Sequence, residues 1–217
     1  PEWNDANNAL VGYGASMVTV YYMKRFLSFF NSVLQETNLE TIAVSTEVIT
    51  WIHSVNNIIS DWQDEGNSHI ISNQERMEYI SQLGTVFSEY RTKVYEKGFN
   101  GQKELAIEAI NDFLCTLINE LDNTIQLNED SNGFYHAYNT INLDLKSKSE
   151  NIKHLPIMLE GQVAALSSGQ LDMDNVISLL ESIFESKLYR ADQHSFILYP
   201  VKDTTPFLHK NIIQPQS

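Results

Sequence analysis

The stretch from Leu10 to Gln35, LVGYGASMVTVYYMKRFLSFFNSVLQ, decides the fold class of this chain. Its apolar residues recur at the spacing of an α-helix, at Leu10, Tyr13, Met17, Tyr21, Leu27, Phe30 and Leu34. Tyr22, Phe26 and Phe29 make further faces of the same helix apolar, which predicts that the helix is buried on several sides. We therefore expect a long, largely buried helix in a mainly α-helical protein.

Helical periodicity continues along most of the chain. Five further helices are expected: one after the N-cap residue Ser45, one opening at Ser72, one from about Lys103 to Ile125, one from about Pro156 to Ser168, and one capped by Asp172 or Asp174. Glu75 follows Ser72 by three residues, which is the capping-box pattern of a helix start. Gly98 to Gly101 predicts a break between helices, and Gly169 predicts a helix end.

One segment departs from the helical pattern. Asn128 to Gly133 has the composition of a turn, and Phe134 to Leu143 (FYHAYNTINL) is rich in aromatic and β-branched residues, which predicts a strand or hairpin arm. The predicted architecture is a single, mainly α domain over residues 1–217, built from antiparallel helical hairpins with one small β-hairpin element. Helices layered around an active-site funnel and a plain helical bundle fit this periodicity equally well.

Composition excludes several classes of partner. The formal net charge is −14, and a surface of that sign repels phosphate backbones and anionic lipids. We therefore expect no nucleic-acid partner and no membrane partner, whereas a neutral sugar is compatible with the charge. Cys115 is the only cysteine, so no internal disulfide can form, and its apolar neighbours predict a buried thiol. Lys24, Arg25 and Asn31 interrupt the longest apolar stretch, which argues against a membrane span.

The first residue is Pro1 rather than Met, and no secretory signal follows it. We interpret the chain as a piece of a larger protein or as a processed one. A soluble protein is expected, and the cytoplasm is favoured, although no feature of the sequence fixes the compartment.

The opening segment, PEWNDANNAL, is the first candidate for chemistry. The carboxyl groups of Glu2 and Asp5 flank Trp3 and Asn4 just before the long helix. A carboxylic acid beside an apolar wall can hold a proton at neutral pH and donate it to a glycosidic oxygen. The competing interpretation is a helix cap, because helix starts select the same residue types.

Two later segments are further candidates. In GFYHAYN, His136 could act as a general base, as a ligand for a hydroxyl group, or as an ordinary strand residue. In LEGQVAALSSG, Glu160 and Gln162 would be solvent-facing residues of an ordinary helix if the segment has no function. The sequence contains no histidine spacing of a metal site, no phosphate-binding glycine-rich loop and no GxSxG motif.

Together these segments resemble one family. EWNDANNALVG resembles the DWNDGxN pattern of the cellobiose-phosphorylase family of (α/α)6-barrel enzymes, and its layout is similar to the DEYHEN-type segment of the maltose-phosphorylase family. GFYHAYN followed by LEGQVAALSSG is similar to the cellobiose-phosphorylase family's aromatic "RAY" strand and its QSWAVLSG-type helix. The three segments occur in the family's order. Three departures are Glu2 in place of Asp, four helices between the first two segments, and no phosphate-binding His and Thr-Gly elements.

The resemblance implies an incomplete, C-terminal part of an (α/α)6 toroid that cleaves a glycosidic bond with inversion, by hydrolysis or phosphorolysis. Glu2 aligns with the family's general acid, and Asp5 is the alternative. Trp3, Asn4, His136 and Gln162 would contact an oligosaccharide or glycoside, no metal or cofactor is implied, and inorganic phosphate would be needed only by a phosphorylase. The rest of the parent polypeptide would complete the barrel, so the chain alone should be inactive. The alternative is a non-catalytic α-helical binding or scaffold module.

Overall fold

The computed structural model describes Leu10 and residues 12–64, 72–200 and 205–210 of the 217-residue chain. Helices occupy most of these residues: α2 (Met17–Gln35), α3 (Thr46–Asp64), α4 (Asn73–Lys97), α5 (Ile107–Gln126), α6 (Leu159–Ser168), α7 (Met173–Glu185) and the short α8 (Phe207–Lys210). The prediction of a mainly α protein is confirmed. Within the described residues, no helix combines the length and apolar character that crossing a bilayer requires.

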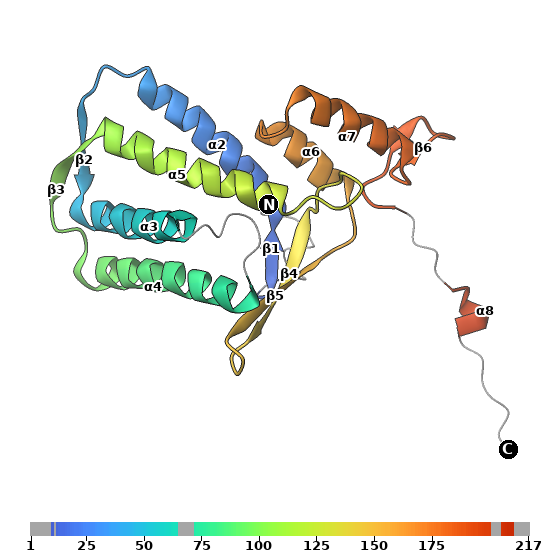
Figure 1. Cartoon of the computed structure of the whole chain (residues 1–217), viewed down its shortest axis with the longest axis horizontal. Helices are drawn as coiled ribbons and strands as arrows, with labels where there is room; N and C mark the ends of the chain where they lie inside the picture. The colour runs from blue at the N-terminus through green and yellow to red at the C-terminus, as the bar shows by residue number, and fades with distance from the viewer. Residues whose placement is uncertain (1–9, 11, 65–71, 201–204, 211–217) are drawn as a thin grey trace.

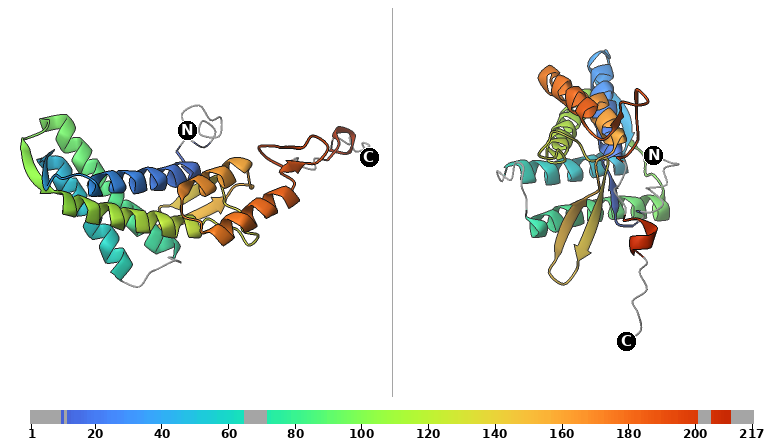
Figure 2. Two further views of the ribbon diagram at one scale, coloured as in Figure 1. Left: turned by 90° about the horizontal axis from the view of Figure 1, so that it is seen from above. Right: turned by 90° about the vertical axis from the view of Figure 1, so that its right-hand side faces the viewer.

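The long helices alternate in direction and pack in pairs. α2 lies against α5 on one side and α6 on the other, while α3 packs on α4 and also on α5 (Figure 1). Figure 2 shows that the α3–α4 pair runs at an angle to the α2–α5 pair. The core is accordingly divided into three clusters of buried side chains. One surrounds Tyr21 and Tyr138, one surrounds Leu105 and Leu114, and one surrounds Ile59 between α3 and α4.

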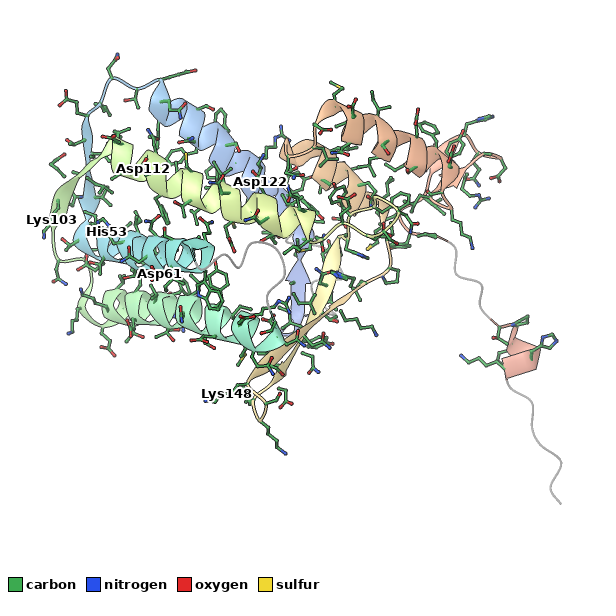
Figure 3. The ribbon with its side chains drawn as sticks, viewed as in Figure 1. His53, Asp61, Lys103, Asp112, Asp122 and Lys148 are labelled. Atoms are coloured by element: carbon green, nitrogen blue, oxygen red, sulfur yellow. The ribbon has the colours of Figure 1, made fainter. Side chains whose placement is uncertain are left out.

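Short antiparallel sheets join the helices. Strands β1 (Gly14–Ser16), β4 (Tyr138–Asp144) and β5 (Ser149–His154) form one sheet in the order β1-β4-β5. Strands β2 (Thr41–Ser45) and β3 (Gln102–Ala106) form a second sheet, and β6 (Tyr189–Arg190) pairs with β7 (Ser195–Phe196). β4 and β5 form the expected hairpin, whose tip holds Lys148 (Figure 3). The hairpin begins later than the predicted segment, because residues 134–137 lead into it as irregular chain.

Three helices start later than predicted: α6 begins at Leu159 rather than at about Pro156, and the other two are α2 and α5. α2 begins at Met17 rather than Leu10, because residues 14–16 pair with β4 and Ser16 caps the helix by accepting a hydrogen bond from the Thr19 amide. α5 begins at Ile107 rather than near Lys103, because residues 102–106 pair with residues 41–45 along their whole length. In both places pairing with a distant strand overrides a local preference for helix.

The expectation that α2 is buried on several sides is wrong. Its exposed apolar side chains are Tyr22 (46% exposed), Met23 (47%), Phe26 (60%), Phe29 (66%), Phe30 (38%) and Val33 (44%). At 100° per residue these six positions fall on one continuous face, which contains no charged residue. The opposite side carries the buried Lys24, whose Nζ lies 3.4 Å from Oδ1 of Asp122 on α5 (Figure 3).

A second apolar face is exposed on α7, at Met173, Ile177, Leu180 and Phe184. The prediction of a buried Cys115 is also wrong, because its side chain points out of α5 and is exposed. Exposed apolar stripes of this length on helices commonly mark a surface that another molecule or segment covers.

Candidate functional site

Three segments that lie far apart in the sequence meet in one part of the molecule. Strand β1 pairs with β4, so that Gly14 lies opposite Thr140 and Ser16 opposite Tyr138. Helix α6 packs on α2, and its Ala164 and Ala165 share a core cluster with Met17 and Tyr21 of α2 and with residues 135, 137 and 138. The chain that follows the opening WND motif, the GFYHAYN segment and the LEGQVAALSSG helix are therefore packed against one another.

A buried hydrogen-bond network centres on Asn128, which is 3% exposed. Its amide nitrogen donates to the backbone oxygen of His136 at 2.7 Å and to the hydroxyl oxygen of Tyr21. Its amide oxygen accepts from Nδ2 of Asn139 at 2.9 Å. Burial raises the pKa of Tyr21 well above its usual value, so its hydroxyl stays protonated and donates to the same His136 oxygen at 3.0 Å. The network fixes the backbone that carries His136.

The network continues to a pair of histidine rings. His136 and His154 stack with their ring centroids 4.3 Å apart and their planes 14° apart. Nδ1 of His136 lies 2.8 Å from the Leu155 carbonyl oxygen, and Nδ1 of His154 lies 2.9 Å from Oδ1 of Asn139. Because both partner atoms are acceptors, each Nδ1 carries a hydrogen, and in a neutral ring with this tautomer Nε2 accepts a hydrogen bond. Burial, and then the neighbouring His136, lower the pKa of His154, which favours its neutral form.

Gln162 holds the same segment from the other side. Its side chain is fully buried, its Oε1 accepts from the Tyr135 amide at 2.9 Å, and its Nε2 donates to the backbone oxygens of Tyr135 at 2.8 Å and Met158 at 2.9 Å. Gly161 lies so close that a Cβ there would be 2.5 Å from the Tyr135 oxygen. In this arrangement Gln162 positions the backbone next to His136, and its amide hydrogens are both used by the protein.

Two carboxylates border the network. Oε2 of Glu160 accepts from the Tyr138 hydroxyl at 3.1 Å, and Oε2 of Glu129 accepts from the Tyr135 hydroxyl at 3.1 Å. Glu160 is therefore not the freely solvated residue that the plain-helix interpretation predicted. Among the described residues, no group of three or more His, Cys, Asp and Glu side chains has the arrangement of a metal site. The cluster offers hydrogen-bond acceptors and a pair of stacked imidazole rings.

The predicted site residues divide into two sets. His136 and Gln162 lie in one network, while Glu2, Trp3, Asn4 and Asp5 lie outside the described residues. Sequence reasoning missed Asn128 and His154. Asn128 had only the signal of a turn residue, and His154 becomes a neighbour of Asn139 only through the β4–β5 register. Such pairs cannot be found from spacing along one segment.

No protein-family model matches the chain, and no curated protein matches it significantly.

Proposed function

We propose that this chain is the acid-bearing part of a carbohydrate-active enzyme that cleaves a glycosidic bond with inversion, by hydrolysis or by phosphorolysis. Glu2 would donate a proton to the leaving oxygen, with Asp5 as the alternative acid. Trp3 and Asn4 would position the sugar. The substrate would be an oligosaccharide or a glycoside, and inorganic phosphate would take part only in phosphorolysis.

One observation carries this proposal. The chain that directly follows the opening segment, the GFYHAYN segment and the LEGQVAALSSG helix pack against one another, although more than a hundred residues separate the first from the second. β1 follows the opening motif directly and pairs with β4, while α6 packs on both α2 and the chain before β4. Segments that build one active site must be close in space, and the described parts of the chain meet this requirement.

The histidine pair supports a site that binds the hydroxyl groups of a sugar. Hydrogen bonds fix each Nδ1–H toward the protein, which leaves Nε2 of His136 and of His154 as acceptors for hydroxyl groups. His136 would therefore bind a substrate hydroxyl. Gln162 would act through its hydrogen bonds to Tyr135, by holding His136 in place, and not by contacting the sugar itself.

The exposed apolar faces of α2 and α7 support a larger assembly. Both faces would be covered if further helices of a parent polypeptide completed an (α/α)6 toroid around the described hairpins. The same faces would serve a non-catalytic helical binding or scaffold module, which is the competing function. Activity measurements separate the two.

The parent protein provides the test, with a panel of disaccharides and glycosyl fluorides assayed with and without phosphate. Glu2→Gln should lower turnover of disaccharides by roughly two to four powers of ten and affect the fluorides much less, because an activated leaving group needs no proton. Asp5→Asn should cost about 1 kcal/mol of stability if Asp5 caps a helix, and little turnover. Proton NMR of the first-formed sugar should show the inverted anomer.

Three results would contradict parts of this proposal. If Asp5→Asn gives the leaving-group-dependent loss and Glu2→Gln does not, the acid is Asp5. If neither change affects turnover, the opening motif is a cap and the glycosidic function is wrong. If the 217-residue chain alone turns over disaccharides, the need for a larger barrel is wrong, because part of a barrel should not enclose a transition state.

A further inference from the structure

The apolar face of α2 is a continuous exposed surface along the upper edge of the helical layer in Figure 1, with α5 below it. Its members are Tyr22, Met23, Phe26, Phe29, Phe30 and Val33, which are 38–66% exposed. An aromatic side chain carries about 150–250 Å² of surface, so this face, with its four aromatic rings, presents on the order of 500 Å². A patch of this size lies at the upper end of what monomeric proteins expose, about 300–600 Å², and commonly marks a contact site.

Four of these side chains have the spacing of a seam between two paired helices. They follow one another at intervals of four, three and four residues, which is the pattern of the inner positions of two helices packed side by side. The four are Tyr22, Phe26, Phe29 and Val33. In the middle of the face, the rings of Phe26 and Phe30 stack with their centroids 6.0 Å apart and their planes 5° apart. The face therefore has the pattern and the ordered aromatic surface on which another helix packs.

The charge of the chain restricts which helix that is. The face contains no charged side chain, so it offers no counter-charge to an acidic or a basic partner. Arg25 borders the face, but its Nη1 donates to Oγ of Ser167 on α6 at 2.7 Å, which holds the guanidinium on that side. The formal net charge of −14 makes two copies of the chain repel each other. At the α2 face, however, two copies can meet without bringing like charges into contact.

The seam is complementary to itself when the second copy runs in the opposite direction. A two-fold axis between residues 27 and 28 places Phe26 opposite Phe29 of the second copy, and Tyr22 opposite Val33 of the second copy. A large side chain then meets a small one at each end of the seam, and aromatic rings pack on each other at its centre. A parallel pair would place Tyr22 on Tyr22 and Val33 on Val33, which fills the two ends unevenly. Antiparallel pairing also brings opposite ends of the helix dipoles together.

We propose that α2 is the interface of a two-fold symmetric homodimer, in which the exposed faces of two α2 helices pack antiparallel. Covering the face on both copies buries about 1,000 Å² in total, which is the lower limit for a specific protein interface. The dimer is therefore weak, with a Kd on the order of 1–100 µM. The interface uses no residue of the opening motif or of the histidine network, so it stands or falls independently of the proposed glycosidic function.

Sedimentation velocity of the 217-residue chain tests the dimer, over a series from micromolar to several hundred micromolar protein. A reducing agent keeps the exposed Cys115 from linking the copies. The chain should shift reversibly from monomer to dimer, and added NaCl should strengthen the dimer, because salt screens the repulsion between two acidic copies. Combining Phe26→Ser with Phe29→Ser should weaken dimerisation about a hundredfold or more, because it removes the apolar centre of the interface from both copies.

The matched control combines Leu180→Ser with Phe184→Ser on α7. These side chains are 43% and 54% exposed and belong to the other apolar face, so their loss should change the dimer Kd by less than about twofold. Circular dichroism establishes that each double variant is folded.

Cysteine cross-linking tests the direction of the pair and does not require the serine variants to fold. Tyr22→Cys and Val33→Cys, each combined with Cys115→Ser, are mixed and gently oxidised. Antiparallel pairing should give the mixed disulfide between positions 22 and 33. Two copies of position 22 would lie about 16 Å apart along the helices, whereas the Cα atoms of a disulfide lie within about 7 Å.

Three results would overturn the proposal. A chain that stays monomeric at several hundred micromolar would leave the α2 face to another segment or protein. An α7 double variant that weakens the dimer as much as the α2 double variant would place the contact on α7. Disulfides that form mainly between like positions would contradict the antiparallel pairing.

Discussion

At the scale of single residues, Gly161 occupies a position with no room for a side chain. A Cβ at this position would lie 2.5 Å from the Tyr135 oxygen and 3.0 Å from the Ala137 nitrogen, and neither backbone atom can move without disturbing the network around His136. Gly161→Ala should therefore lower the free energy of unfolding by about 1–3 kcal/mol, although Ala is the better helix former. Gly84→Ala is the control, because Gly84 is exposed on α4 with nothing within 4 Å, and should stabilise by up to about 1 kcal/mol. Urea unfolding measures both, and equal effects would contradict the close contact.

The histidine pair makes a second prediction at this scale. Since the pKa of His154 is lowered in the folded chain, the unfolded chain binds more protons at mildly acidic pH. The contribution of His154 to stability is therefore fully present above its unfolded pKa of about 6.5 and decreases as the pH falls below that value. His154→Asn keeps a donor for Asn139 and removes the titration, so its unfolding free energy should change less between about pH 7.5 and 5.5 than that of the unaltered chain. His53→Asn, at an exposed position of α3, is the control, and an unchanged pH dependence in His154→Asn would contradict the assignment.

At the scale of elements, mutations on the two sides of α2 should change the unfolding free energy by very different amounts. Phe26→Ser and Phe29→Ser alter side chains that are 60% and 66% exposed, so each should change the unfolding free energy by no more than about 0.5 kcal/mol and should reduce self-association of the chain. Tyr21→Ala, on the buried side, should cost about 3–5 kcal/mol, because it opens a cavity and leaves Asn128 without its hydroxyl partner. Chemical denaturation and sedimentation velocity give the two quantities, and a large loss from Phe29→Ser would show that the outer face is part of the core.

The start of α5 shows why some element boundaries were not predictable. The sequence QKELA of residues 102–106 has no alternation that favours a strand, and it continues directly into the apolar stripe of α5. It becomes β3 because residues 41–45 offer a pairing partner about sixty residues away, and the Ile107 amide then donates to the Glu40 oxygen. The helical and extended conformations of residues 102–106 differ little in free energy, so pairing with residues 41–45 selects the strand. The capping box at Ser72 and Glu75 was predictable, because both hydrogen bonds form within four residues.

At the scale of the whole molecule, the sequence by itself determined the helical class, most of the helix ends and the β-hairpin after the turn at Asn128. These features depend on contacts between near neighbours: the spacing of apolar residues, caps such as Ser72, and the glycine stops. Only the tertiary structure decided that His154 stacks on His136 and that the side-chain amide of Gln162 hydrogen-bonds to backbone groups. It also decided that the apolar face of α2 points outward. Each of these depends on which segments become neighbours across the chain. Periodicity shows that a helix face is apolar, but the packing of other elements determines which apolar face they cover.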